Sequence, residues 1–450
     1  MAEIQPFRAY RYDLKRVALK DVLTQPYDKI SPQMQEKYYN ASPYNLIPVE
    51  KGRSLENDSP ENNVYTRAAQ KVHNWIAEKI LVQDGAPAIY IYTQEFQVPG
   101  TQTRRTRVGF ISLVRVEDYD AKVVFRHERT LSGPKADRIE LLRRTGAQTG
   151  QLFFLYEDPA RQIDNLLETV TSQTPAIELV DEYETIHRVW PVTDKALIDA
   201  LQKAMADKKL IIADGHHRYE TALALRNEAR AKSGNHNRMA ASEFAMATII
   251  NAHSKGLTIL PTHRVVRHAS FDFEKFRKDL SSYFDWYAYP FQNASERAAS
   301  YAEFRKDLES QSDTRHAIGV YPVHKDASGC FYLFVLRKEA DLEALLPDIS
   351  AAQRDLDVVL LHRLLLDKGL GITAEAVTAE KNVSYEREMD LAIAHVDRGD
   401  AQVAFLLNAA RMDQVSQIAL GGDVLPQKST DFYPKLLSGL TIFKVEGNLG

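Results

Sequence analysis

Several features that define common protein classes are absent from this sequence of 450 residues. Cys330 is the only cysteine, which excludes a disulfide framework and a thiolate metal cluster. There is no run of about 18 apolar residues, and the start M-A-E-I-Q-P-F-R-A-Y lacks a charged and then apolar leader. We therefore expect a soluble, cytoplasmic protein without a membrane partner. The net charge of −4 also disfavours nucleic acid as the main partner, because proteins that neutralise several phosphates usually carry a basic excess.

Common catalytic signatures are missing as well. The sequence contains neither G-x-x-x-x-G-K-[ST] nor a G-x-G-x-x-G that opens a helix after a strand, which disfavours a P-loop and a Rossmann dinucleotide site. The nucleophile elbow G-x-S-x-G and the zinc signature H-E-x-x-H are also absent. Catalytic residues must therefore be sought in other clusters of polar side chains.

The order of strands and helices predicts an α/β fold of mixed α+β character. With 44% hydrophobic residues, the chain can form about two to three domains, each with its own core. The periodicity of apolar residues predicts, among others, helices over 273–284 and 354–366. We divide the chain into an N-terminal α/β segment (1–122), a core that carries the site (123–269), an accessory α/β domain (270–345) and a C-terminal segment that completes the site (346–450).

The most informative stretch covers residues 210–226, L-I-I-A-D-G-H-H-R-Y-E-T-A-L-A-L-R. Three aliphatic residues indicate the end of a buried strand, A-D-G a tight turn, and the residues from about His216 a helix. The unpaired N–H groups and the dipole at the start of such a helix attract anions, most often phosphate. An acid, two histidines and an arginine within five residues strengthen this interpretation, because burying them only to hold a turn is energetically unfavourable.

A second cluster of ionisable residues lies at 125–138, F-R-H-E-R-T-L-S-G-P-K-A-D-R. Such a density of charge at the end of a strand is typical of a solvated loop. It also fits a catalytic loop in which Glu128 is a base or a metal ligand and Lys135 and Arg138 contact phosphate oxygens. The residues alone leave both interpretations open.

Three further groups have competing interpretations. His216 and Glu220 are spaced i, i+4 and could share Zn²⁺ with His127, but a hydrogen bond between them has the same spacing. His263 and Arg264 follow a proline, and for an isolated pair of this kind a structural role is favoured. The tail contains hydroxyls and amines of the kind that bind phosphate, although chain ends are often polar. These tail residues are Lys428, Ser429, Thr430 and Lys435.

Several motifs together resemble a known family. They are P-Y-D-K-I, R-H-E-R-T, G-P-K-A-D-R, I-A-D-G-H-H-R-Y-E-T-A-L, L-P-T-H-R-V-V and S-T-D-F-Y-P-K-L-L-S-G-L. In this order they closely resemble the family labelled domain of unknown function number one thousand and fifteen, over nearly the whole chain. The label of that family names no activity.

A more distant likeness concerns the strand, the D-G-H-H-R block and the helix. This segment is similar to the phosphate-binding segment of the ParB and sulfiredoxin superfamily, which implies a ParB/sulfiredoxin-like nucleotide-binding core for residues 123–269. Free-serine kinases of that superfamily carry a similar block and use a glutamate from an earlier segment as the base toward the serine hydroxyl. The block itself covers Asp214, Gly215, His216, His217 and Arg218. We infer that Glu128 is the equivalent of the earlier glutamate.

The resemblance implies a nucleotide-dependent phosphotransferase that acts on a small hydroxyl compound, with free L-serine as the leading candidate. The implied cofactors are ATP or ADP, with CTP left open as donor, and Mg²⁺. The partners are this substrate and the nucleotide, and self-association is compatible with the sequence. The alternatives are a nucleotide-binding regulatory protein of the ParB type and a metal-dependent phosphohydrolase that uses His127, His216 and Glu220.

The expected site divides by role. The catalytic candidates are Glu128, Asp214, His216 and His217, and Asp214 is also the candidate ligand of Mg²⁺. The candidates for binding the nucleotide are His127, Thr130, Lys135, Arg138, Gly215, Arg218, His263, Arg264 and Lys435.

Overall fold

The computed structural model describes residues 1–128, 132–233, 237–311, 315–324 and 328–449, without the side chains of 132–135 and 233. The chain divides into two compact units. Unit 1 comprises Met1–Arg126, Thr130–Thr258 and Pro434–Gly450, and unit 2 comprises His127–Arg129 and Ile259–Tyr433. Both units combine sheets with helices, so the predicted mixed α/β class is confirmed. The four segments expected from the sequence stay a prediction. In the part of the chain that is described, no helix is long and apolar enough to cross a membrane.

Unit 1 is built on a sheet that has nine strands among the described residues, in the order β6-β11-β8-β12-β5-β4-β10-β9, with β1 beside β5. The pairs β11–β6 and β12–β8 are parallel, and the other pairs are antiparallel. The strands of the sheet are β1 (Ile4–Gln5), β4 (Ile89–Gln97), β5 (Arg104–Arg115), β6 (Val124–Arg126), β8 (Leu152–Tyr156), β9 (Ile177–Val180), β10 (Ile186–Val192), β11 (Leu210–Asp214) and β12 (Phe244–Asn251).

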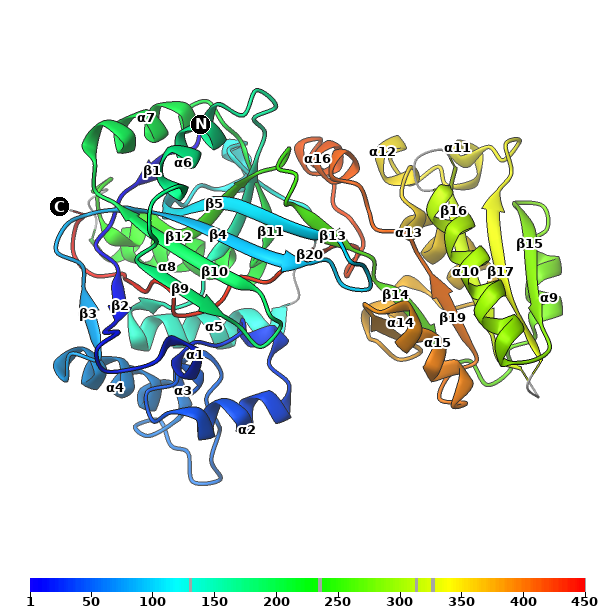
Figure 1. Cartoon of the computed structure of the whole chain (residues 1–450), viewed down its shortest axis with the longest axis horizontal. Helices are drawn as coiled ribbons and strands as arrows, with labels where there is room; N and C mark the ends of the chain where they lie inside the picture. The colour runs from blue at the N-terminus through cyan, green and yellow to red at the C-terminus, as the bar shows by residue number, and fades with distance from the viewer. Residues whose placement is uncertain (129–131, 234–236, 312–314, 325–327, 450) are drawn as a thin grey trace. The chain divides into compact units, whose positions relative to one another are not determined.

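Helices and short strand pairs complete unit 1. The short pairs are β2 (Tyr10–Tyr12) with β3 (Leu81–Gln83), and β7 (Ala147–Gln148) with β21 (Phe443–Lys444). The helices are α1 (Leu19–Val22), α2 (Pro32–Ala41), α3 (Ile47–Glu50), α4 (Val64–Ala77), α5 (Ser132–Thr145), α6 (Gln162–Thr171), α7 (Lys195–Met205) and α8 (His216–Ser233), with 3-10 turns at Tyr27–Lys29, Tyr119–Ala121 and Ala241–Glu243. Helices α6 and α7 lie on one side of the sheet and α1 to α4 on the other (Figure 1).

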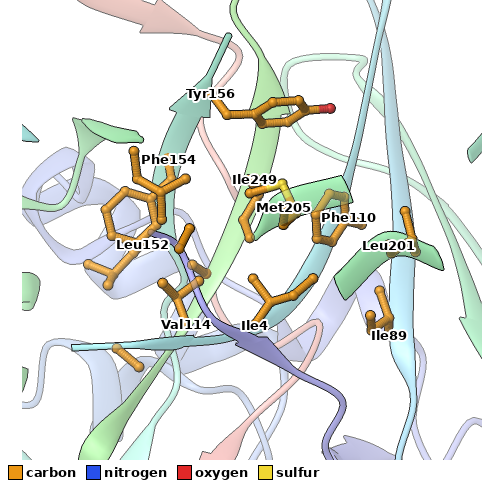
Figure 2. Close-up of a cluster of buried hydrophobic side chains, with 14 of the residues drawn as sticks. Ile4, Ile89, Phe110, Val114, Leu152, Phe154, Tyr156, Leu201, Met205 and Ile249 are labelled. Carbon is orange, nitrogen blue, oxygen red and sulfur yellow. The ribbon is translucent and has the colours of Figure 1, made fainter. Parts of the chain in front are cut away.

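The hydrophobic core of unit 1 occupies the face of the sheet that α6, α7 and α8 cover. Alternate residues of each strand point into it, as the two-residue period of a strand requires. Figure 2 shows Leu201 and Met205 of α7 gathered in one cluster with Phe110 and Ile249 of the sheet. All four side chains are buried. At about 25 cal/mol per Å² of apolar surface, this burial is the main source of stability of the unit.

The opposite face of the same sheet is partly polar. Arg107 and Gln94 are buried there, at positions that alternate with the core residues of β5 and β4. An irregularity in β11 adds an acid to this face. Ile212 pairs with the core residue Phe154, but Asp214 pairs with Phe153, whose ring lies under the Arg107 guanidinium at 4.8 Å. Because cross-strand partners share a face, the shift turns Asp214 away from the hydrophobic core and toward the polar side.

Unit 2 contains an antiparallel sheet of six strands among its described residues, in the order β15-β17-β16-β19-β14-β18. Helices α10 and α15 bury apolar residues against one face of this sheet. The strands are β14 (His263–Val266), β15 (Phe284–Phe291), β16 (Ala317–Pro322), β17 (Gly329–Leu336), β18 (Val383–Glu386) and β19 (Val403–Leu406), and β13 (Thr258–Leu260) pairs separately with β20 (Asp431–Tyr433). The helices are α9 (Phe273–Asp279), α10 (Ala294–Ser310), α11 (Leu342–Leu345), α12 (Ala351–Arg354), α13 (Asp357–Leu360), α14 (Ala374–Thr378), α15 (Met389–Asp397) and α16 (Met412–Leu420), with a π-helical segment at Leu361–Lys368.

Two helices predicted in unit 2 differ from the structure. The helix predicted over 273–284 ends at Asp279, and Phe284 begins strand β15. The helix predicted over 354–366 is interrupted at Asp355 and Leu356, between α12 and α13. Only the first residue of the predicted span, Arg354, lies before the break, and α12 has no buried residue, whereas α13 buries Val358, Val359 and Leu360. The predicted helix is therefore present from Asp357 onward.

Candidate functional site

The predicted strand, turn and helix are present at the end of β11. Asp214 is the last residue of the strand, and Gly215 has φ +90°, which a residue with a side chain rarely adopts. Helix α8 then starts at His216, and the N–H of Tyr219 donates to the Gly215 carbonyl at 2.9 Å. The start of an 18-residue helix thus follows directly on the polar face of the sheet. Its N–H groups and dipole favour an anion there.

Asp214 is ionised because cations surround it. Lys435 Nζ lies 3.1 Å from Asp214 Oδ2, and the side chains are only 12% and 23% exposed. Burial by itself would raise the pKa of Asp214, but the charges of Lys435, Arg218 and Lys29 outweigh burial and hold this pKa far below its usual value. The acid therefore stays charged over the whole physiological pH range.

Arg218 and Gln151 bring two buried donors to the same place. The Arg218 guanidinium donates to the Gln151 carbonyl. Its Nε is buried and has no hydrogen-bond partner among the described residues. The Gln151 side chain accepts from the Thr248 hydroxyl, but its Nε2 is likewise buried without a partner among these residues. Buried donors are nearly always satisfied in native proteins, so this pair indicates a place for an external acceptor.

Arg107 adds a permanent positive charge on the polar face. It is fully buried, its Nε donates to Gln94 Oε1 at 3.1 Å, and its guanidinium donates to the Pro434 carbonyl at 2.5 Å. Burial lowers the pKa of Arg107 to about 10, and the charge of Asp214 opposes this shift. Arg107 is therefore protonated at neutral pH and helps to keep Asp214 ionised.

Arg138 and Arg218 line one small cavity of about 60 Å³. Arg138 is held by its Nε bond to Asp137 Oδ2 at 2.8 Å and by a bond to the Glu50 carbonyl at 2.8 Å. Its guanidinium also lies 4.3 Å from the centre of the Tyr27 ring. Burial raises the pKa of Tyr27 to about 12, against the opposing charge of Arg218. Two arginines that were predicted to bind phosphate are thus close to each other in the fold.

The predicted site residues fall into two groups. Unit 1 contains Arg138, Asp214, Gly215, His216, His217, Arg218 and Lys435. Both histidines are half-buried at the start of α8. Lys135 lies in α5, but its side chain and the whole of Thr130 are outside the described residues. Unit 2 contains His127, Glu128, His263 and Arg264.

In unit 2, His127 and Glu128 lie next to Thr430. His127 Nε2 is 2.7 Å from the Thr430 hydroxyl, which also reaches Glu128 Oε1 at 3.5 Å. His127 is buried, whereas the Glu128 side chain is 19% exposed. Glu128 is therefore accessible enough to act as a base. Its predicted role in catalysis stays a prediction.

His263 has a structural hydrogen bond. Its Nδ1 accepts from the backbone N–H of Leu407 at 3.1 Å. Burial, and to a smaller extent the charge of Arg264, lower the pKa of His263 to about 4. The ring is therefore neutral at pH 7, as this bond requires. The contact of His263 with a nucleotide stays a prediction.

The predicted zinc ligands do not come together in the described residues. Among the residues that the structure describes, no group of three or more His, Cys, Asp and Glu side chains could hold a metal ion. The zinc set of His127, His216 and Glu220 is therefore not formed in this part of the chain. Mg²⁺ needs fewer protein ligands, because it is usually bound by one or two carboxylates together with substrate phosphates and water.

Several residues of the site were not predicted from the sequence. Arg107 and Gln94 lie in ordinary strand patterns, Gln151 directly precedes β8, and Glu50 lies in a short helix far from the other residues in the chain. Glu50 accepts from Thr149 Oγ1 at 2.7 Å and from Ser438 Oγ at 3.0 Å, so it holds three distant segments together. A charged residue at a strand position that should be buried was the signal available for Arg107.

Gly215 can be tested against a matched glycine. An added Cβ would lie 3.1 Å from Arg218 Nε and 3.2 Å from Leu152 Cδ2, whereas at Gly100, which also has a positive φ, it would meet nothing within 4 Å. We expect Gly100→Ala to lower the free energy of unfolding by about 1 kcal/mol from backbone strain alone. Gly215→Ala should cost about 1 kcal/mol more, because Arg218 must move. Urea denaturation of both variants measures the difference. Equal losses of unfolding free energy in the two variants would show that Arg218 does not crowd a side chain at position 215.

The ion pair of Asp214 predicts that Lys435→Gln destabilises the fold. The folded pKa of Asp214 lies below its unfolded value of about 3.9, so ionisation of Asp214 stabilises the fold above about pH 4 and this contribution is lost as the pH falls. Removing Lys435 raises the folded pKa. We expect a loss of about 2 kcal/mol at pH 7, less than for a fully buried pair, and nearly the same loss at pH 3, because a folded pKa so far below the usual value leaves the ion pair formed at pH 3.

Denaturation of wild type and variant at the two pH values measures this effect. The control is Lys195→Gln, whose amine is 85% exposed beside Asp199 and should change stability by less than about 0.5 kcal/mol at either pH. Equal stabilities of wild type and Lys435→Gln at pH 7 would show that the amine does not hold Asp214 ionised.

Comparison with known proteins places the chain in a family. Matching solved structures include a conserved hypothetical protein from Pyrococcus furiosus (13% identity, TM-score 0.34, covering 74% of this chain and 95% of that one). They also include a free serine kinase in complex with AMP (12% identity, TM-score 0.35, covering 76% of this chain and 97% of that one). A third is C-terminally truncated SbnI from Staphylococcus aureus (10% identity, TM-score 0.32, covering 73% of this chain and 87% of that one). At these TM-scores the likenesses assign no activity. A search of curated proteins found no match. A family profile matches residues 4–380, and the chain therefore belongs to the family described as "Protein of unknown function (DUF1015)".

Proposed function

We propose that the protein is a nucleotide-dependent phosphotransferase that acts on a small hydroxyl compound. The observation that carries this proposal is the start of α8, where Arg218 Nε and Gln151 Nε2 are buried donors without a partner among the described residues. Next to them lie an ionised acid, Asp214, and the amine of Lys435. Fixed donors and charges of this kind bind the phosphates of a nucleotide and stabilise the charge that develops in phosphoryl transfer.

The charges of the site suit a polyanion better than a neutral ligand. Arg107, Arg138, Arg218 and Lys435 provide four cations, and the acids near them include Asp137, Asp214 and Glu50, which lines the same cavity as Arg138 and Arg218. Each phosphate of a nucleotide carries about one negative charge or more, so a bound nucleotide would balance the surplus. The Arg138 and Arg218 side chains line the same small cavity, from which both could reach a phosphate group.

The roles of the individual residues follow from their chemistry. In the transfer, the acceptor oxygen forms a bond to phosphorus, the bond from phosphorus to the leaving nucleotide oxygen breaks, and the hydroxyl proton passes to a base. Glu128 is the proposed base, and His216 or His217 would contact the transferring group. Free L-serine as the acceptor, with ATP or ADP as the donor, rests on the likeness of the D-G-H-H-R block to that of free-serine kinases.

Asp214 is the residue of this site that would hold Mg²⁺. Its permanent negative charge fits a hard cation, which would neutralise phosphate charge when bound. Asp214 Oδ1 accepts from the Gly215 N–H at 2.7 Å and Oδ2 faces Lys435, so Asp214 could supply only part of a coordination shell. The remaining ligands would be water and phosphate oxygens.

A product assay tests the reaction. The full chain is incubated with Mg²⁺ and ATP, ADP or CTP, with and without L-serine, and phosphoserine, free phosphate and pyrophosphate are measured. Phosphoserine that forms only with serine supports the proposal. Release of phosphate or pyrophosphate without an acceptor would identify a hydrolase instead. Saturable nucleotide binding without any product would favour a nucleotide-binding regulatory protein.

Two matched pairs of variants separate binding from chemistry. Arg218→Gln should weaken nucleotide binding at least about tenfold, because a charge-assisted hydrogen bond contributes about 1.5–3 kcal/mol, whereas Lys232→Gln on the same helix should change it little. Glu128→Gln should abolish transfer and leave the dissociation constant of the nucleotide nearly unchanged, whereas the exposed Glu339→Gln should keep full activity. Turnover that survives in Glu128→Gln would exclude Glu128 as the base.

A further inference from the structure

A second cavity is lined by residues of unit 2, among them Arg264, whose predicted contact with the nucleotide stays a prediction. It has a volume of about 150 Å³ and lies where β14, the beginning of β16, the break between α12 and α13 and the beginning of α16 come together. Its lining is unusually rich in charge. The ionisable side chains around it are Arg264, Arg315, His316, Asp355, Asp357 and Arg411.

The two acids of this cavity already have partners. Asp357 Oδ1 lies 2.9 Å from His316 Nδ1, and burial raises the pKa of Asp357, against the opposing effect of His316. Asp355 Oδ2 accepts from Gln414 Nε2 at 3.0 Å and lies 3.6 Å from the Arg411 guanidinium. Both carboxylates of the lining, Asp355 and Asp357, therefore have partners among the other residues that line the cavity.

Two of the arginines that line the cavity lack a carboxylate partner among the described residues. Neither Arg264 nor Arg315 has a carboxylate within 4.0 Å among the described residues. Arg264 is 1% exposed and donates to the carbonyls of Thr262 and Lys428, while its Nε has no partner in this part of the structure. Arg315 donates to the Leu336 carbonyl at 3.0 Å.

Arg264 nevertheless keeps its charge. Burial lowers its pKa to about 10, while Tyr385 and the more distant carboxylate of Glu128 oppose the shift. A guanidinium that is both buried and charged is destabilising unless an anion compensates it. A donor that remains unpaired on such a group indicates where that anion would bind.

We propose that this cavity binds a small organic oxyanion, a carboxylate or phosphate ester of a few carbon atoms. The planar guanidinium groups of Arg264 and Arg315 would hold the oxyanion, a geometry to which arginine is well suited. A dry cavity of comparable volume accommodates benzene, so a ligand of about that size fits. The polar side chains of Asn408 and Ser429 in the lining would bind a hydroxyl or amine of the same ligand.

The break between α12 and α13 contributes directly to this cavity. Asp355, Leu356 and Asp357 all line it, and they are the residues at which the expected continuous helix is interrupted. A straight helix would point these three residues in different directions around its axis. The interruption therefore has the effect of presenting two acids, each with its partner, to the same small volume.

Calorimetric titration of the full chain tests the proposal. The probes are succinate and glycerol 3-phosphate, with glycerol as the uncharged control. We expect saturable binding of succinate or of glycerol 3-phosphate, and the arm that saturates identifies a carboxylate or a phosphate ester. Glycerol should not bind. If neither organic anion binds, the proposal is wrong.

Variants place the bound anion in this cavity. Arg315→Gln should weaken its binding at least tenfold, and Arg264→Lys, which keeps the charge but not the planar group, should also weaken it. The control Arg398→Gln removes a guanidinium of unit 2 that is 55% exposed beside Asp400 and should have no effect. Arg315 is only half-buried, so the Arg315→Gln variant keeps the test valid if Arg264→Lys does not fold.

One more variant distinguishes this site from the nucleotide site. Arg218→Gln changes unit 1 only and should leave binding of the small anion unchanged, whether or not the protein proves to be a phosphotransferase. Loss of anion binding in Arg218→Gln, together with normal binding in Arg315→Gln, would place the anion in unit 1 and overturn the proposal.

Discussion

The charge on Asp214 is the constraint on which the rest of the unit 1 site depends. A carboxylate that is mostly withdrawn from water needs cations close to it, and these come from distant parts of the chain. Lys435 follows Asp214 by 221 positions, and Arg107 reaches the same face from a different strand. The last residues of the chain must therefore cross the polar face of the sheet. This explains why Pro434–Gly450 belongs to unit 1 although the preceding residues belong to unit 2.

The two units use buried arginine in different ways. In unit 1, Arg107 donates to Gln94 and to the Pro434 carbonyl, and its charge helps to hold Asp214 ionised. In unit 2, Arg264 donates only to backbone carbonyls and has no carboxylate partner within 4.0 Å among the described residues. Both guanidinium groups remain charged at neutral pH. The first charge has a role in the fold itself, whereas the second is explained best by an external anion.

Local sequence patterns predicted the helices and strands of the site well where all the residues of a motif are consecutive in the chain. The strand, the glycine and the helix at 210–226 are consecutive, so apolar period and turn chemistry were sufficient to predict them. Arg138 and Arg218 were both predicted to bind phosphate, and the fold brings them to one cavity. Arg107, Gln151 and Glu50 could not be recognised in this way, because their neighbours in space come from other strands and helices. The helix predicted from Arg354 starts only at Asp357, because Leu356 is buried at the apolar spacing but lies before the first turn of α13.

By itself, the sequence determined the mixed α/β class, the family and the turn at Gly215, because composition, motif order and the conformational freedom of glycine are properties of the chain alone. Tertiary structure alone decided which face Asp214 occupies. A one-residue shift in the pairing of β11 moves this side chain from the hydrophobic core to the polar face, and pairing register depends on the neighbouring strand β8. It also decided that Lys435 pairs with Asp214 and that Arg264 is buried without an acid, since charges separated along the chain meet only when it folds.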